Sequence, residues 1–227
     1  MLAKKYRSEV ISIENPFEGI YTLEFKSLGT KYKYLPGQFL HIALDCDYDG
    51  TTQWPESRCF SMQSNPDEET IKITYSVKGV FTQEMEKTLQ IGSEVWLKLP
   101  YGDLFQKPHN KKNCIFIAGG TGITPFLSLF SHPSFADYES PTIYLGFRSK
   151  EFNIYQTILE QSSNSSVRIE VFIENEEGVI NIDKIFKEHG VQSCYFISGP
   201  PVMISIFKKF LIDQGVDSDQ ILTDDWE

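Results

Sequence analysis

The residues best placed to do chemistry lie where a buried strand runs into three closely spaced glycines. Residues Cys114–Pro125 read CIFIAGGTGITP, and the glycines are Gly119, Gly120 and Gly122. Glycines at such a turn let the backbone approach a ligand closely, and the N-terminus of a helix that follows offers unpaired N–H groups to an anion. The segment therefore predicts a pyrophosphate-binding loop. The alternative is a tight strand-to-helix turn that binds nothing.

The start of the following helix has a pattern of its own. Thr124 is expected as the N-cap and Pro125 as the first helical residue, a combination that suits a helix N-terminus. The loop does not match the dinucleotide fingerprint G-x-G-x-x-G, because Pro125 stands where the third glycine belongs. The phosphate prediction therefore depends on the glycines and on the strand before them.

Two earlier segments also carry groups that suit phosphate. Arg58–Ser61 (RCFS) places a guanidinium, an aromatic ring and a hydroxyl close together, and Ser64 follows three residues later. A guanidinium pairs well with phosphate oxygens. Lys78–Thr82 (KGVFT) opens a short helix with a glycine and a hydroxyl, again an anion-binding arrangement. The alternatives are a surface ion pair for Arg58 and a core position for Phe60.

A fourth segment ends another predicted strand. Tyr195–Met203 (YFISGPPVM) leaves a buried strand through a Gly-Pro-Pro turn. The carboxyl ends of strands are where open α/β sheets bind their ligands. The turn is therefore expected to lie beside the glycine loop.

The pattern of the chain changes near its middle, which predicts two domains. Residues 1–106 contain short alternating strands punctuated by turns, typical of an antiparallel sandwich or barrel. Residues 107–227 alternate buried strands with amphipathic helices, typical of a parallel sheet. The polar stretch Gln106–Lys112, which contains a proline, is the expected linker. The predicted fold class is two-domain α+β, an N-terminal antiparallel β-barrel and a C-terminal α/β domain with a parallel sheet.

The expected elements can be bounded from the same patterns. The strands of the first half are Tyr6–Ile13, Tyr21–Phe25, Gln38–Leu44, Arg58–Met62, Ile71–Val77 and Val95–Leu99, with a short helix at Thr82–Leu89. The strands of the second half are Cys114–Ala118, Thr142–Gly146, Arg168–Ile173, Cys194–Ser198 and Gln220–Thr223. The helices between them are Pro125–Phe130, Asn153–Gln161, Ile182–His189 and Val202–Asp213.

Composition excludes several classes of protein. The 227 residues are 41% hydrophobic and carry a net charge of −10, which disfavours binding to nucleic acid or to an anionic membrane. Apolar runs are far shorter than the ~18 residues of a spanning helix, and Met1–Tyr6 lacks a signal-peptide pattern, so a cytoplasmic location is expected. No C-x-x-C pair indicates a zinc or iron–sulfur site, so no metal is expected. Reduced, mostly buried thiols are expected at Cys46, Cys59, Cys114 and Cys194.

In this order and spacing, the motifs resemble the ferredoxin-NADP reductase superfamily of flavin- and pyridine-nucleotide-dependent oxidoreductases. The resemblance runs from Pro36–Phe39 (PGQF) to the C-terminus. It implies an FAD-binding barrel at residues 1–106 and an NAD(P)-binding domain at residues 107–227. FAD is the implied cofactor, with FMN as the alternative. The implied reaction is hydride transfer from nicotinamide to flavin, followed by electron delivery to an acceptor.

The resemblance also implies roles for individual residues. Arg58 corresponds to the flavin pyrophosphate ligand, Phe60 to the ring that stacks on the isoalloxazine, and Ser61 to the catalytic hydroxyl beside flavin N5. The other implied flavin-binding residues are Cys59, Ser64, Gly79, Val80, Phe81 and Thr82. The implied nicotinamide-nucleotide residues are Gly119, Gly120, Thr121, Gly122, Pro125, Gly199, Pro200 and Pro201, with Ser198 at the catalytic turn.

Three positions depart from the pattern of the superfamily or leave it open. Phe60 replaces the usual tyrosine, which keeps the stacking ring and loses a phenolic hydrogen bond. Ser198 replaces a frequent cysteine. Trp226 corresponds to the C-terminal aromatic over the flavin, with Asp224 or Glu227 as its nearby acid. A frayed terminus is the alternative.

The choice of nicotinamide cofactor depends on charges at the strand ends. A 2′-phosphate calls for Arg or Lys after the second and third strands of the domain. Arg148–Lys150 (RSK) offers a clamp after the second, but Glu174–Gly178 (ENEEG) follows the third. Carboxylates repel a phosphate and accept ribose hydroxyls, so NADH is favoured over NADPH, with Glu174 at the ribose. The alternative is a solvated acidic loop.

The electron acceptor is expected to be a separate molecule, either a protein (a ferredoxin-like carrier or an oxygenase component) or a small molecule, and the chain is taken as a monomer. The net charge of −10 disfavours a strongly acidic ferredoxin unless a local basic patch exists. The candidates for such a patch are Lys4, Lys5, Arg7, Lys31 and Lys33. Two alternatives stay open: a reductase that uses free flavin as substrate, and a non-catalytic nucleotide-binding or regulatory module that retains the fold.

Overall fold

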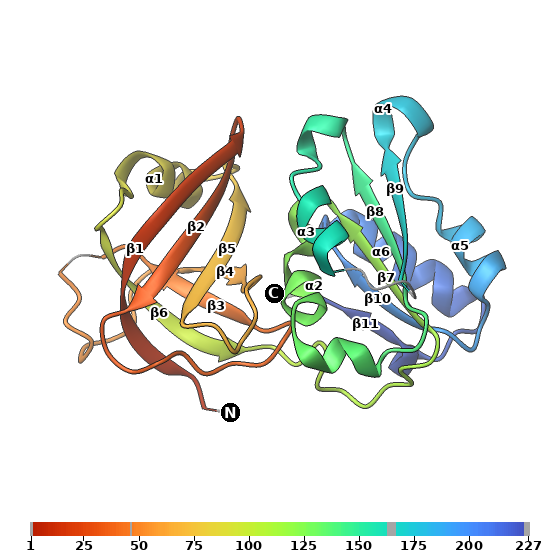
Figure 1. The fold of residues 1–227 in the computed structure, drawn as a ribbon, viewed down its shortest axis with the longest axis horizontal. Coiled ribbons are helices and arrows are strands. Elements are labelled where there is room, and N and C mark those ends of the chain that lie inside the picture. The colour runs from red at the N-terminus through yellow and green to blue at the C-terminus, as the bar shows by residue number, and fades with distance from the viewer. Residues whose placement is uncertain (1, 46, 163–166, 225–227) are drawn as a thin grey trace. The chain divides into compact units, whose positions relative to one another are not determined.

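The structure is a computed structural model that describes residues 2–45, 47–162 and 167–224. It divides the chain into two compact units, Met1–Asp103 with Thr124–His132, and Leu104–Ile123 with Pro133–Glu227. The first unit contains an antiparallel barrel and the second a parallel sheet with helices (Figure 1). The predicted two-domain fold class is confirmed.

The barrel is a single antiparallel sheet. In the described part of the first unit, six strands pair in the order β4-β3-β6-β1-β2-β5. They are β1 (Lys4–Phe17), β2 (Ile20–Ser27), β3 (Phe39–Ala43), β4 (Arg58–Ser61), β5 (Thr70–Ser76) and β6 (Glu94–Tyr101). Just beyond β4, the backbone N–H of Gln63 donates to the carbonyl of Lys72 on β5 at 2.9 Å. This bond brings the two ends of the sheet together, so the barrel is nearly closed.

Alternation along these strands explains the core of the barrel. Leu40 and Ile42 on β3 and Leu97 and Leu99 on β6 are fully buried, while the residues between them face outward. The helix α1 (Val80–Thr88) covers one side of this core with Phe81 and Met85, which lie four residues apart on one helix face.

The helix α2 (Thr124–Phe130) follows the glycine loop and groups with the barrel unit. From the sequence, residues 107–227 are predicted as the second domain, which includes this segment. The reason for the grouping is local bonding: the backbone N–H of Gly37 donates to Ser128 Oγ at 2.8 Å, and Asn65 Nδ2 donates to the carbonyl of Ser131 at 2.9 Å. Ser128 is fully buried, so its hydroxyl satisfies a backbone group that water does not reach.

The second unit is built on a parallel sheet. Within its described residues, five strands pair in the order β11-β10-β7-β8-β9. They are β7 (Cys114–Gly119), β8 (Thr142–Phe147), β9 (Arg168–Ile173), β10 (Cys194–Ser198) and β11 (Ile221–Thr223). The chain passes from β7 outward to β9, then returns to the other side of β7 to form β10. The carboxyl ends of β7 and β10 therefore border the topological switch point, where open α/β sheets bind ligands.

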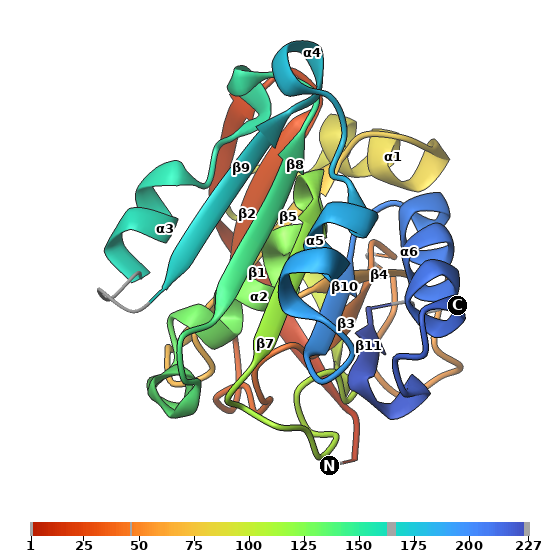
Figure 2. The same ribbon diagram turned by 90° about the vertical axis from the view of Figure 1, so that its right-hand side faces the viewer.

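Helices and short turns complete the second unit. The α-helices are α3 (Gln156–Ser162), α4 (Glu174–Glu177), α5 (Ile182–His189) and α6 (Pro201–Asp213), and the 3-10 turns are η1 (Gly120–Ile123), η2 (Pro133–Asp137), η3 (Lys150–Phe152) and η4 (Ser218–Gln220). Figure 2 shows α5 and α6 on the same face of the sheet, where they pack on alternate residues of β7 and β10. The opposite face is aromatic, because Phe116 and Phe196 stack there with ring centres 5.0 Å apart. Among the described residues, no helix has the length and apolar character needed to cross a bilayer.

Several predicted boundaries change. Thr124 is not an N-cap, because the turn η1 runs straight into α2 and the helical path starts at Gly120, whose φ of +56° bends the chain out of β7 at once. The helix α1 begins at Val80, α3 begins only at Gln156, and β11 begins at Ile221. The acidic segment expected as the loop Glu174–Gly178 forms the short helix α4 instead.

Candidate functional site

Two glycine turns meet at the switch point of the parallel sheet. A Cβ built on Gly122 would lie 2.5 Å from the Cα of Gly199 and 2.7 Å from the carbonyl carbon of Ser198. Gly199 itself has a φ of +143°, a conformation that other residues rarely adopt. The loop after β7 and the turn after β10 therefore pack backbone against backbone, which requires glycine at both positions.

The same contact continues along the loop. A Cβ on Gly119 would lie 2.9 Å from Pro200 Cδ and 3.1 Å from Met203 Sδ. Pro200 is the N-cap of α6 and Pro201 its first residue, where a missing N–H costs nothing. Most of the residues predicted to bind the nicotinamide nucleotide are thus brought together at the carboxyl ends of β7 and β10. Pro125 differs, because it lies buried within α2.

Ser198 has a partner from the end of the chain. Its Oγ donates to Asp224 Oδ2 at 3.3 Å, and the backbone N–H of Asp224 donates to the carbonyl of Ile197 at 3.0 Å. Ser198 is buried, so the carboxylate fixes the direction of its hydroxyl. Trp226 and Glu227, which the sequence analysis also named, lie outside the described residues.

In the barrel unit, the structure brings the two predicted flavin motifs together. The guanidinium of Arg58 on β4 lies over the ring of Phe81 on α1, 5.2 Å from its centre. It also pairs with Glu56 Oε1 at 2.8 Å and donates to the carbonyl of Ser57 at 2.8 Å. The Arg58 side chain keeps 52% of its exposure, and that of Glu56 keeps 74%. A half-exposed guanidinium thus lies beside a helix start.

The start of α1 is held by a hydroxyl. Thr82 Oγ1 accepts from the backbone N–H groups of Lys78 (2.9 Å) and Gly79 (3.1 Å) and donates to the carbonyl of Gly79. A Cβ at Gly79 would meet nothing within 4 Å, and Val80 is 83% exposed. The first N–H groups of a helix have no partner inside it, so this end presents donors and the positive end of a dipole to open space.

Phe60 and the nearby serines are more enclosed than Arg58. Phe60 is 9% exposed and packs in the barrel core, edge-to-face with Tyr75 at 5.8 Å between ring centres. Ser61 is buried at the end of β4. Ser64 is tied into the barrel, because its Oγ accepts from the backbone N–H of Lys72 at 3.0 Å and contacts Tyr34 Oη at 3.0 Å. Phe60 thus packs against the barrel core, and its role in flavin binding stays a prediction.

Cys59 does not join this group. Side chains alternate along a strand, so Cys59 faces away from Arg58 and Phe60. Its Sγ lies 3.4 Å from Nε2 of His41 on the neighbouring strand. Burial raises the pKa of the Cys59 thiol, and the charge of Arg58 offsets part of that effect. Only the backbone of Cys59 is therefore in a position to contact a ligand bound beside Arg58.

Charges meet at the carboxyl ends of β8 and β9. Lys150 Nζ, which follows β8, pairs with Glu176 Oε1 on α4 at 3.0 Å. The backbone N–H of Asn175 donates to the carbonyl of Arg148 at 3.3 Å. The two predicted determinants of cofactor choice are therefore neighbours, and one cation of the predicted clamp is paired with an acid.

Two carboxylates have ion-pair partners at the site that were not predicted: Glu56 was missed altogether, and Glu176 was named only as part of the acidic segment Glu174–Gly178. Glu56 lies just before β4 and only two residues from Arg58, so a local signal for this ion pair existed in the sequence. Glu176 had no such signal, because its pairing with Lys150 depends on β8 and β9 being neighbours. Within the described residues, no group of three or more His, Cys, Asp and Glu side chains is arranged to hold a metal ion.

A nearly closed antiparallel barrel, followed by a parallel sheet with glycine turns at its switch point, is the two-domain fold of ferredoxin-NADP reductase-like proteins. A solved ferredoxin NADP+ reductase from Neisseria gonorrhoeae with bound FAD and NADP matches with a TM-score of 0.79. The match covers 99% of this chain and 98% of that one at 18% identity, so it speaks for the fold.

Sequence relatives point in the same direction. The propane 2-monooxygenase reductase component of Mycolicibacterium goodii is 28% identical over 240 residues, which cover 96% of this chain and 66% of that protein. Flavohemoprotein A of Dictyostelium discoideum is 24% identical over 203 residues, which cover 83% of this chain and 51% of that protein. The chain thus spans less than two thirds of the length of these relatives. No protein-family model matches it. The resemblance to the ferredoxin-NADP reductase superfamily is confirmed, in fold and through relatives that are reductase components and flavohaemoproteins.

Proposed function

We propose that this protein is an NAD(P)H-dependent flavoprotein reductase that takes a hydride from nicotinamide onto a bound flavin and passes electrons to a separate acceptor. The observation that carries the proposal is the approach of Arg58 on β4 to Phe81 in the first turn of α1. A guanidinium and a helix N-terminus at one place form a recognition site for a dinucleotide pyrophosphate. The reductase-component relative supports the same activity.

The groups at this place fit FAD. Arg58 supplies a full positive charge, the first turn of the nine-residue helix α1 supplies N–H donors, and Gly79 leaves space for a phosphate to approach. Two such anchors favour the two phosphates of FAD over the single phosphate of FMN. We assign flavin binding to Arg58, Cys59, Phe60, Ser61, Ser64, Gly79, Val80, Phe81 and Thr82. The flavin, when bound, supplies the capacity to accept a hydride and release electrons, and the protein supplies binding and orientation.

We assign the nicotinamide nucleotide to the two glycine turns at the switch point. Gly119, Gly122 and Gly199 pack backbone against backbone with no room for side chains, so we expect a ligand at these turns to meet main-chain groups. Ser198 is assigned the place beside the nicotinamide ring. Because its hydroxyl donates to Asp224, its lone pairs stay available as acceptors for an amide N–H.

We propose NADH rather than NADPH as the electron donor. Lys150, a predicted 2′-phosphate ligand, is paired with Glu176, and the acids Glu151 and Glu177 also act on its charge. The carboxylate of Glu174 lies on the same four-residue helix as Glu176. A 2′-phosphate would therefore meet net negative charge, while ribose hydroxyls would find acceptors.

Substitution of Glu176 tests this preference. Glu176→Gln frees Lys150, so the ratio of kcat/KM for NADH to that for NADPH should fall by about 3- to 10-fold. Asp213→Asn is the matched control, since it removes one exposed acid from a lysine pair on α6, away from the strand ends. An equal ratio in wild type and both variants would remove this acidic group from the ribose site.

The acceptor is proposed to be a protein without a strongly acidic surface, such as an oxygenase component, or a small molecule. Three of the basic side chains considered for a docking patch have local partners. Lys5 donates to the carbonyl of Gly50 at 3.0 Å, Arg7 pairs with Glu94, and Lys31 pairs with Glu69 at 3.0 Å. The net charge of −10 therefore disfavours binding of an acidic ferredoxin, because these three basic side chains already have partners of their own.

The decisive experiment is anaerobic titration of the purified protein with NADH. Yellow protein that bleaches on NADH addition and recolours with an added acceptor supports the proposal. Colourless protein that rejects added flavin would overturn it in favour of a regulatory module. Colourless protein that oxidises NADH only while free flavin is supplied would replace it with a reductase that uses flavin as substrate.

A further inference from the structure

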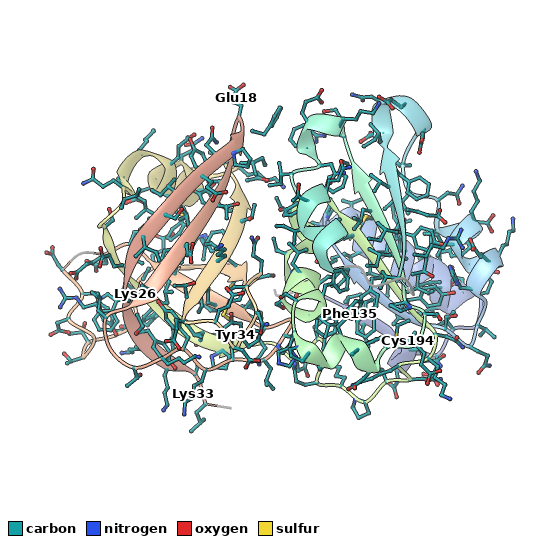
Figure 3. The ribbon with its side chains drawn as sticks, in the orientation of Figure 1. Glu18, Lys26, Lys33, Tyr34, Phe135 and Cys194 are labelled. Carbon is teal, nitrogen blue, oxygen red and sulfur yellow. The ribbon has the colours of Figure 1, made fainter. Side chains whose placement is uncertain are left out.

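Two buried thiols face each other at the start of the parallel sheet. Cys114 and Cys194 are the first residues of β7 and β10 and are direct partners in the parallel register. Neighbouring strands lie about 4.7 to 4.9 Å apart, within the range of about 4.4 to 6.8 Å that disulfides span between Cα atoms. Both residues are 1% exposed, and the neighbouring Cys194 thiol contributes to raising the pKa of the Cys114 thiol. Figure 3 labels Cys194, at the end of the sheet opposite α4.

Polar groups surround these thiols. Cys114 Sγ donates to the carbonyl of Asn110 at 3.0 Å. The phenol of Tyr138 lies close enough to both thiols for their charge to raise its pKa, a smaller effect than that of its burial. Lys111 lies over the Tyr138 ring, and Tyr138 Oη is 2.8 Å from His109 Nε2. Burial alone is ordinary for free cysteine, so the proposal depends on the direct register pairing of the two residues across β7 and β10.

We propose that Cys114 and Cys194 are a redox-active dithiol, which hydrogen peroxide converts to a cross-strand disulfide. One thiol gives two electrons to the peroxide, whose O–O bond breaks, and the products are a sulfenic acid and water. The second thiol attacks that sulfur, the S–S bond forms, and a second water leaves. The balance is two thiols and one hydrogen peroxide to one disulfide and two waters, and a dithiol reductant reverses it.

The surroundings set the speed of this reaction. The neighbouring Cys194 thiol and burial both raise the pKa of the Cys114 thiol, and the charge of Lys111 offsets only part of this. A thiol reacts as its thiolate, so the pair oxidises slowly at neutral pH. It therefore responds to sustained rather than brief exposure to peroxide.

The position of the pair in the chain determines how the disulfide would affect stability. The strands β7 and β10 carry the two glycine turns at their other ends. A bond between Cys114 and Cys194 closes a loop of 80 residues that contains β8 and β9. Closing so long a loop restricts the unfolded chain strongly, so the oxidised protein is expected to be the more stable form.

Peptide mapping after peroxide treatment tests the proposal. Wild-type protein is incubated with hydrogen peroxide, unfolded, alkylated and digested without reductant. The expected result is one cross-linked peptide pair joining Cys114 to Cys194, a mass lower by two hydrogens, and a Tm higher by about 5 °C or more. Dithiothreitol should reverse all three.

Cysteine variants test whether Cys114 and Cys194, and not another cysteine, form the disulfide. Cys59→Ser removes the half-buried thiol beside His41 and should leave the cross-link unchanged, whereas Cys194→Ser should abolish both the cross-link and the rise in Tm. Mapping of the wild type decides the matter if Cys194→Ser does not fold. Recovery of Cys114 and Cys194 as alkylated peptides, or cross-links only to other cysteines, would overturn the proposal. Neither result bears on the reductase activity, which is measured separately.

Discussion

Replacement of Arg58 by alanine should weaken flavin binding while leaving the barrel folded. The ion pair with Glu56 joins two side chains that are 52% and 74% exposed, so its loss costs at most about 1 kcal/mol of stability. The contact with Phe81 adds about 0.5 to 1 kcal/mol. A charge-assisted bond to phosphate is worth about 1.5 to 3 kcal/mol, so the Kd for FAD should rise by about 10- to 150-fold.

Isothermal titration with FAD measures this Kd, and a thermal melt reports the folding. Arg7→Ala is the matched control, because Arg7 is also an exposed arginine of the barrel paired with one carboxylate, Glu94. Glu56→Gln tests the same reasoning from the opposite side, because removal of the competing carboxylate should tighten FAD by up to about 5-fold. An unchanged Kd in Arg58→Ala, or equal weakening in Arg7→Ala, would refute the assignment.

Two further predictions concern the glycine turns and acid stability. Gly122→Ala would press a methyl group against the backbone of Gly199, so we expect a loss of about 1 to 3 kcal/mol and weaker NADH binding, measured by thermal melt and titration. Gly29→Ala, where a Cβ meets nothing within 4 Å, should leave both unchanged. Burial lowers the pKa of three histidines, so the unfolded chain takes up protons first, and the Tm should fall as the pH drops below about 6.5. These histidines are His41, His109 and His189. His189→Gln should flatten that decline, and an equally steep decline in the variant would contradict the explanation.

Local pattern predicted the strands well, because barrel strands such as β3 and β6 bury alternate residues, whereas β7 and β10 of the parallel sheet are nearly continuous buried apolar runs. The strand β10 matches its predicted bounds, and β7 exceeds them by one residue. The predicted strand Tyr6–Ile13 is shorter than β1, because β1 continues to Phe17 in a hairpin with β2, where Phe17 pairs with Ile20. The segment that became α4 contains no apolar residue, so no periodicity could reveal it as a helix.

The candidate site was predictable in its residue types and less so in its partners. Glycines at a strand end and an arginine in a strand are visible in sequence. Whether Phe60 stacks on a ligand or packs in the core depends on Tyr75, which lies on another strand. The bond between Ser198 and Asp224 joins residues 26 positions apart, through the adjacency of β10 and β11. Such partners follow from the order of strands in a sheet, which a local pattern does not specify.

Two cations predicted to bind phosphate, Arg58 and Lys150, each form an ion pair with a carboxylate, but the expected effect on phosphate binding differs between them. Arg58 shares an exposed pair with Glu56, and a pair of that kind is worth at most about 1 kcal/mol, so we expect a pyrophosphate with more negative charge to displace Glu56. Lys150 is paired with Glu176 and also lies in the field of Glu151 and Glu177. A 2′-phosphate that displaced Glu176 would still face the other acids. Under the proposed assignments, the same ion-pair chemistry would favour the pyrophosphate of a flavin in the barrel and disfavour the extra phosphate of NADPH at the sheet.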